Sequence, residues 1–150
     1  MSLRLSFAAA ALCTIILTSC STISSNRMVK YITPDNLDAV FENKLNNKTD
    51  VEKYFGKPTF RLKDSNGNFA GYRYVYDRFK PHAVSIIPVN PYKIYYHKTR
   101  FVDIFFDAQS NVRNYEISGI SYTRYVNAFN GKETIEDQCP LTTEELQQWE

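Results

Sequence analysis

Residues that carry catalytic or metal-binding chemistry are scarce in this sequence. It has three cysteines and two histidines in 150 residues. Cys13 and Cys20 belong to an N-terminal segment whose expected processing, described below, leaves Cys139 as the one available thiol. We therefore expect neither an internal disulfide nor a zinc site built on cysteines. We expect Cys139 to be a passive thiol, with an intermolecular bridge as the alternative. His82 and His97 lack the spacing of a metal or catalytic motif and are predicted to be ordinary polar residues.

The common enzyme motifs are missing as well. There is no glycine-rich phosphate loop and no Gly-x-Ser-x-Gly elbow. Asp103 and Asp107 share a face of one expected strand, but we interpret Asp107 as a turn residue and Asp103 as solvent-facing. We therefore predict no catalytic residue, no metal, no cofactor and no small-molecule substrate, and we expect the protein not to be an enzyme.

An excess of charge of either sign is also absent. The chain has 18 Lys and Arg against 16 Asp and Glu, with no basic stripe that could neutralise phosphates, so nucleic acid is not an expected partner. Glycines are few, at five, whereas tyrosines and phenylalanines number 11 and ten. This composition is typical of a sheet with one face on a core and one available for contact.

Long hydrophobic runs are limited to one N-terminal segment. Arg4 precedes an apolar run from Phe7 to Leu17, which is too short to span a bilayer but has the proportions of a secretory signal. The run leads into Leu17-Thr18-Ser19-Cys20, which resembles a bacterial lipoprotein box. That resemblance implies cleavage after residue 19 and acylation of Cys20, which anchors the mature chain in the membrane. A plain secreted protein is the alternative. Because Ser21, and not an aspartate, follows the cysteine, the resemblance favours an outer-membrane location facing the periplasm.

The rest of the chain is predicted to be one domain of the α+β class. Residues 20–31 are expected to be the lipidated cysteine and a flexible tether, residues 32–120 the domain, and residues 121–150 a C-terminal extension with a short helix. Two N-terminal helices are expected to pack on one face of a three- to four-stranded antiparallel sheet. The helices begin at caps near Thr33 and Thr49, and the second ends at Gly56. The expected strands are 59–63, 69–77, 95–107 and 112–119, with a proline-rich loop over 78–92.

Three segments together resemble the SmpA/OmlA family of small outer-membrane lipoproteins, the BamE-like group. They are Thr49-Asp50-Val51 through Phe55-Gly56-Lys57-Pro58, then Tyr72-Arg73-Tyr74, then Val102 to Asp107 with Val112. The resemblance covers about Thr33 to Gly119 and implies an ααβββ fold and a role in outer-membrane assembly. The sequence departs from the pattern where Asn46-Asn47-Lys48 and Ser110 replace glycines, so it is identified as a divergent member.

Partner contacts are predicted on exposed aromatic and aliphatic side chains. Three tyrosines of the 69–77 strand share a face, which suits either a core or a protein interface. Two phenylalanines of the next strand face away from the expected core, and four aliphatic residues fall in the proline-rich loop, the first choice for a partner or membrane-surface contact. The predicted contact residues are Tyr72, Tyr74, Tyr76, Val84, Ile86, Ile87, Val89, Phe101 and Phe105.

The function expected from these features is a lipid-anchored, periplasm-facing binding or scaffold module. It is predicted to support the assembly or stability of an outer-membrane or envelope protein complex, and its partners are the membrane, through Cys20, and envelope proteins. The alternatives are a pilotin-like accessory of a secretion or conjugation machine, an inhibitor of a periplasmic enzyme, and a hydrolase with an unrecognised site.

Overall fold

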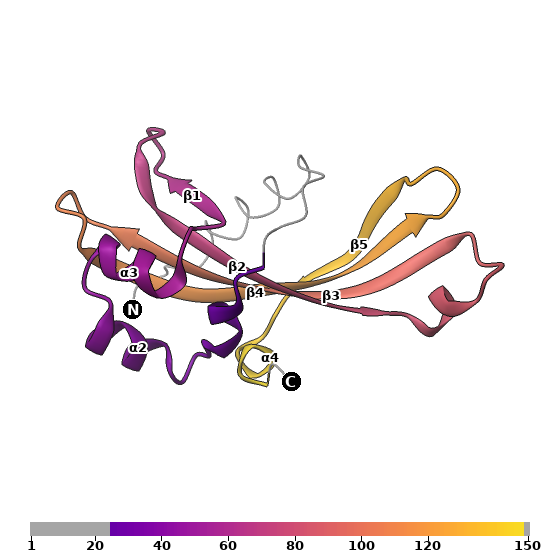
Figure 1. Cartoon of the computed structure of the whole chain (residues 1–150), viewed down its shortest axis with the longest axis horizontal. Helices are drawn as coiled ribbons and strands as arrows, with labels where there is room; N and C mark the ends of the chain where they lie inside the picture. Colours follow the sequence, from indigo (N-terminus) through magenta and orange to yellow (C-terminus); the bar gives the residue numbers. More distant parts are fainter. Residues whose placement is uncertain (1–24, 149–150) are drawn as a thin grey trace, which may run out of the picture.

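The computed structural model describes residues 25–148, which form one long antiparallel sheet with short helices (Figure 1). The strands follow one another in sheet order β1-β2-β3-β4-β5, so each pairs with its neighbours in sequence. Among the described residues no helix is long and apolar enough to cross a membrane. The elements are η2 (Arg27–Tyr31), α2 (Leu37–Lys44), α3 (Lys48–Phe55), β1 (Phe60–Lys63), β2 (Phe69–Pro81), η3 (Ala83–Ile86), β3 (Tyr92–Phe106), β4 (Val112–Asn127), β5 (Glu133–Pro140) and α4 (Thr143–Gln147).

The predicted fold, two N-terminal helices on a sheet of three or four strands, is wrong. The sheet has five strands, and the helices lie mostly at its ends. β2 continues to Pro81 through the start of the predicted loop, because a proline can end a strand at the sheet edge without losing a ladder bond. β4 runs on to Asn127, and β5 lies within the predicted C-terminal extension. The sequence of these segments alternates only weakly, but β4 is held as a strand by pairing with β3, and β5 by pairing with β4.

The helix signals are confirmed at the end of α3 and differ at its start. Gly56 ends the helix with φ 77°, a conformation that glycine adopts without steric cost. The predicted cap, Thr49, lies inside the helix, and the side chain of Asn47 instead accepts a hydrogen bond from the backbone N–H of Asp50 at 3.0 Å. The helix therefore begins at Lys48, two residues earlier than the capping-box pattern from Thr49 indicates.

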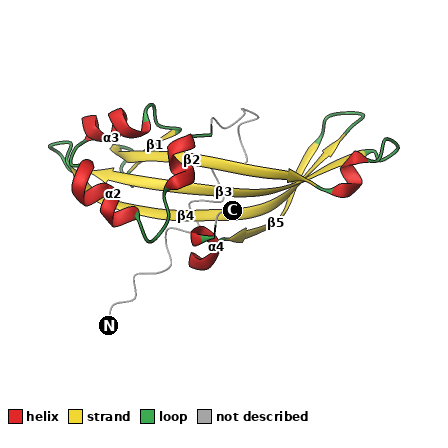
Figure 2. Ribbon diagram, turned by 60° about the horizontal axis from the view of Figure 1, so that its bottom comes forward, coloured by secondary structure: helices red, strands yellow, loops and turns green. Residues whose placement is uncertain are grey.

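The main core lies between the helices and one face of the sheet (Figure 2). Phe55 stacks on Tyr74 with ring centroids 4.8 Å apart, and the Tyr74 hydroxyl donates to the carbonyl of Gly56 at 3.0 Å. Val51 and Phe55 of α3 belong to the same core as Val102 and Ile104 of β3. The fully or nearly fully buried apolar members of this core are Val29, Ile32, Leu37, Phe41, Leu45, Val51, Phe55, Tyr72, Tyr74, Val102 and Ile104.

The segment predicted to be a tether is part of the fold from residue 25 onward. The backbone N–H of Asn26 donates to Val75 O at 2.6 Å, and the backbone N–H of Asp77 donates to the Ser25 hydroxyl at 3.1 Å. Val29 of η2 is fully buried. The chain therefore enters the domain along the outer edge of β2, beyond the end of β1, where unpaired strand groups need partners.

Arg100 of β3 joins both ends of the described chain to the sheet. Its side chain is fully buried, and the guanidinium donates to the carbonyls of Lys30, at 3.1 Å, and of Ile32 at the end of η2. It also donates to the carbonyl of Leu146 in α4. A cation suits this position because helix ends leave carbonyls without intrahelical partners.

The opposite sheet face carries a second, smaller core. Val75, Phe101 and Ile120 are buried there. Asp103, predicted to face solvent, is buried and forms a bidentate pair with Arg73 at 2.7 and 2.5 Å, so that prediction is wrong. The predicted role of Asp107 as a turn residue is confirmed, since its carboxylate accepts from the backbone N–H of Asn111 at 2.8 Å.

Candidate contact surface

The sheet continues beyond its helix-covered half and ends in an apolar surface that we name the distal tip. Three neighbouring parts of the chain build it: the loop holding η3, the start of β3, and the turn between β4 and β5, at the right-hand end of Figure 1. Ile86 is 74% exposed, Val89 87% and Phe129 85%. The distal tip consists of the exposed apolar side chains Val84, Ile86, Ile87, Val89, Tyr92 and Phe129.

The loop that carries most of these side chains is fixed by hydrogen bonds. Ser85 is buried, and its hydroxyl donates to Ile94 O at 2.8 Å and accepts from Ile94 N–H at 2.6 Å. The imidazole of His82 accepts from Val84 N–H at 3.1 Å, and the Asn90 side chain donates to Val84 O at 3.1 Å. The backbone of the loop is thus satisfied internally while its aliphatic side chains point into water, the arrangement expected of a contact surface.

The β4–β5 turn is held against this loop. The backbone N–H of Ala128 donates to Pro91 O at 2.7 Å. The side chain of Asn127 accepts from the backbone N–H of Phe129 at 2.9 Å, and Gly131 takes φ 68°, which the reversal of the chain requires. Phe129 directly follows Ala128, so the bond from Ala128 to Pro91 places it at the same end of the sheet as the aliphatic residues of the loop, about 40 positions away in sequence.

The charges around the distal tip are mostly basic. β5 brings Glu133, Glu136 and Asp137 to this half of the sheet. No Asp or Glu, however, occurs between Asp77 and Asp103 or between Glu116 and Glu133, which form the end of β2, the loop, most of β3 and most of β4. The same stretches carry several basic residues. Lys93 donates to Ser85 O at 2.8 Å and so lies directly beneath the loop. The basic residues flanking the tip are Arg78, Lys80, Lys93 and Lys132.

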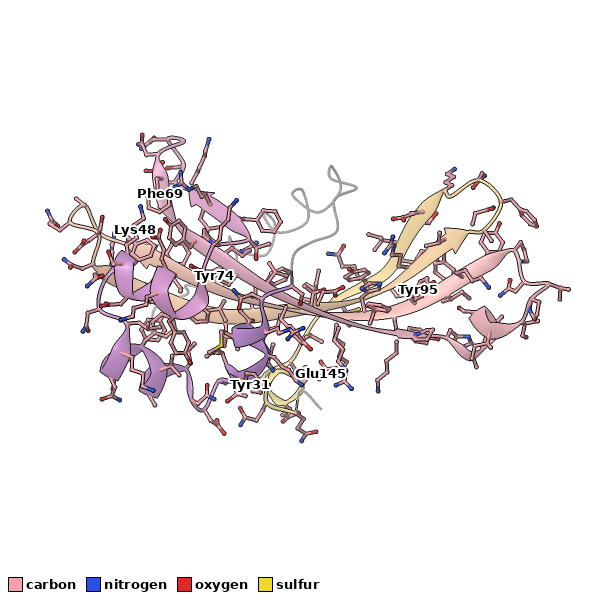
Figure 3. The ribbon with its side chains drawn as sticks, in the orientation of Figure 1. Tyr31, Lys48, Phe69, Tyr74, Tyr95 and Glu145 are labelled. Carbon is pink, nitrogen blue, oxygen red and sulfur yellow. The ribbon has the colours of Figure 1, made fainter. Side chains whose placement is uncertain are left out.

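A polar cluster lies around His97, two residues along β3 from Tyr95. Figure 3 labels Tyr95 in the half of the sheet that leads to the distal tip. His97 is buried, its Nδ1 lies 2.9 Å from Asp77 Oδ2, and its ring stacks on Tyr122 at 4.6 Å. The hydroxyl of Thr99 donates to the other oxygen of Asp77 at 2.7 Å. Burial, and secondly the charge of Asp77, raises the pKa of Tyr122 to about 12. A general base must reach its substrate, so this covered imidazole gives no support to the hydrolase alternative.

The predicted contact residues separate into exposed and buried groups. The four loop residues are exposed as expected, namely Val84, Ile86, Ile87 and Val89. Tyr72 and Tyr74 are core residues under α3, and Tyr76 is half-buried beside α4, so the structure removes this row from the contact surface.

The two predicted phenylalanines are also poor contact residues. Phe101 is buried on the second sheet face, under the guanidinium of Arg73, whose carbon lies 5.0 Å from the ring centre. Phe105 is half-buried and lines an open hollow at the other end of the sheet, with Phe106 and Glu116. The prediction placed both rings on the correct face, but it did not foresee how much the neighbouring side chains cover them.

Sequence reasoning missed the second half of the distal tip. Tyr92 was placed at the end of a loop and Phe129 in an extension without assigned structure. The signal for the latter was present, because Asn127-Ala128-Phe129-Asn130-Gly131 has the composition of a tight turn with an aromatic residue at its apex. The sequence does not show, however, that this turn contacts the loop before β3, because the two segments are far apart along the chain.

The predicted lipidation site, Cys20, lies outside the described residues. Within residues 25–148 no three His, Cys, Asp or Glu side chains gather as metal ligands would. Comparisons with protein families, with curated proteins and with solved structures found no match to this chain. The resemblance to the SmpA/OmlA family therefore stays a prediction from the three segments that carry it.

Proposed function

We propose that this protein is a lipid-anchored, periplasm-facing binding and scaffold module that supports the assembly or stability of a cell-envelope complex. The single observation that carries the proposal is the distal tip, a rigid loop and turn that expose aliphatic and aromatic side chains. A monomer without a partner gains nothing from keeping such side chains in water. The lipoprotein box at Leu17 to Cys20 supports attachment to a membrane at the other end of the chain.

The arrangement supports a scaffold with two attachments. The anchor leads into the domain at Ser25, on the edge of β2, and the tip lies further along the same strand and its neighbours. Two attachments fix the orientation of a domain, whereas a single flexible one leaves it free to rotate. The outer edge of β5 is exposed along its whole length and is then presented in a defined direction.

The test is a complementation experiment in the organism that encodes the chain. The chromosomal copy is deleted, and the wild type, Cys20→Ser, or the tip variant Ile86→Ser with Ile87→Ser is supplied in its place. Entry of a bulky antibiotic that an intact envelope excludes is then measured. We expect the deletion to increase entry, the wild type to reverse it, and neither variant to do so.

A matched control is Gln109→Ser, an exposed change in the β3–β4 turn at the opposite end of the sheet, which should complement fully. The tip variant must keep the thermal midpoint and cellular level of the wild type, because its altered side chains contribute little to the core. A deletion without effect on the envelope, or full complementation by both variants, would overturn the proposal.

A further inference from the structure

We infer that the distal tip contacts lipid, in the interfacial layer of the same bilayer leaflet that holds Cys20. The inference rests on the proposed anchoring and names the component that the tip meets. It follows from three features of this chain: the length of the tether, the position where the tether joins the sheet, and the chemistry of the tip.

The tether is short. Between Cys20 and Ser25 lie only residues 21–24. A fully extended chain spans at most about 3.6 Å per residue, so Ser25 stays within roughly 18 Å of the anchored cysteine. The domain is therefore held directly at the membrane surface, and some part of it must face the headgroups.

The tip lies close to the point where the tether joins. The hydroxyl of Ser25 is bonded to the backbone N–H of Asp77, and Pro81, the last residue of β2, is four positions further along the strand. At about 3.3 Å per residue this is roughly 13 Å, after which the tip loop begins. β3 extends three residues past Tyr95, the partner of Pro81, so the far end of the tip lies roughly 10 Å further on. A domain that lies along the leaflet can therefore bring the tip to it without any change in the fold.

The chemistry of the tip matches a membrane interface. Aliphatic side chains such as Ile86 and Val89 are exposed on the loop, and the aromatic side chains of Tyr92 and Phe129 are exposed at the same end of the sheet. Apolar apexes flanked by aromatic and basic residues are typical of segments that lie in the headgroup and upper acyl region. Basic residues outnumber acidic ones around the tip, and the acidic residue nearest the β4–β5 turn, Glu133, pairs with Arg124. The excess of basic charge complements anionic lipid headgroups.

A protein partner is the competing occupant, and the shape of the surface favours lipid. Two protruding turns, joined by the bond from Ala128 to Pro91, present their side chains outward. A protein would have to supply a matching apolar recess bordered by acids, whereas a bilayer accepts such a convex apolar apex without a shaped recess.

The experiment uses the mature lipidated protein in vesicles of phosphatidylethanolamine and phosphatidylglycerol. With Cys139→Ser and Cys20 acylated, a single added cysteine carries an environment-sensitive fluorophore. The probe is placed at the tip by Val89→Cys, or at the opposite end of the sheet by Gln109→Cys as the control. We expect a blue shift of emission and quenching by spin-labelled lipid at position 89 only.

Neutralising basic residues beside the tip provides a second readout of lipid contact. Lys80→Gln and Lys132→Gln should each lower the ratio of inserted to free tip about fivefold in anionic vesicles, and high salt should do the same. In vesicles of phosphatidylcholine alone the substitutions should have little effect. The tip variant, Ile86→Ser with Ile87→Ser, should abolish the blue shift of a fluorophore placed in the β4–β5 turn by Asn130→Cys, while the protein stays anchored.

Two outcomes would overturn the inference. A probe at position 89 that stays in water in lipid vesicles shows that the tip does not reach the leaflet. A probe shielded only in native envelope membranes, and not in vesicles of their lipids, shows that a protein is the occupant. Neither outcome touches the complementation experiment, so failure of the lipid contact and failure of the scaffold role are distinguishable.

Discussion

Replacing the buried Arg100 by methionine should destabilise the domain by removing the link between its two ends and the sheet. The side chain is fully buried, and its guanidinium donates to the carbonyls of Val29, Lys30, Ile32 and Leu146. Methionine has a similar length and fills much of the same space, but it offers no donor. Carbonyls at the end of η2 and in α4 would then be buried without partners.

The magnitude follows from two opposing effects. Hydrogen bonds to a charged group contribute about 1.5–3 kcal/mol each. Nη1 has two N–H groups for three carbonyls, and Val29 O also accepts from Ile32 N–H, so three full bonds are lost; about 2 kcal/mol each gives about 6 kcal/mol. Burial lowers the pKa of Arg100 from 12.5 to about 10, so removing the charge returns about 3 kcal/mol of desolvation cost. The net loss is on the order of 3 kcal/mol, or roughly 10 °C in thermal midpoint for a domain of this size.

The measurement is urea and thermal unfolding followed by circular dichroism. The matched control is Arg124→Met, which breaks an ion pair with Glu133 on the exposed surface and should cost less than about 1 kcal/mol. Arg100→Lys should be intermediate, because an ammonium group cannot reach carbonyls on two separate elements as a guanidinium does. If Arg100→Met were as mild as the control, the guanidinium would not hold the two ends of the chain.

Three further predictions concern the core, the sheet and the response to pH. Phe55→Ala should lower the free energy of unfolding by about 3 kcal/mol or more, measured by urea titration, because the ring is buried between the helices and β2. Gly71→Ala should cost about 2 kcal/mol or more in the same assay, since a Cβ there would lie 2.2 Å from the backbone oxygen of Ile104. Its control, Gly131→Asn, has open space and a φ that asparagine tolerates, so a loss comparable to that of Gly71→Ala would contradict the steric argument. Between pH 10 and about 12 the unfolded chain loses the phenolic proton of Tyr122 while the folded chain keeps it. Stability should therefore fall with rising pH in this window, by up to about 1.4 kcal/mol per unit, and Tyr122→Phe should flatten the fall in urea midpoints.

The candidate surface could be predicted only where it is local in sequence. The loop residues Val84 to Val89 were found because prolines interrupt an apolar stretch, a pattern that a strand in the middle of a sheet does not tolerate. The tyrosine row was misassigned because strand alternation shows which residues share a face, but not which face the helices cover. Phe129 joined the surface through a contact between turns far apart in sequence, which no local pattern contains.

The sequence by itself determined the local signals of the described chain: the glycine that ends α3 and the turn around Asp107. These depend on the conformational preferences of a few adjacent residues. The resemblance of Leu17 to Cys20 to a lipoprotein box stays a prediction. The tertiary structure alone decided how far the strands run, that Asp103 and Arg100 are buried, and that a distal tip exists. Those features arise from pairing between strands and from carbonyls of η2 and α4 that meet one guanidinium about 70 and 46 residues away in sequence, so their energies belong to contacts that form only when the chain is folded.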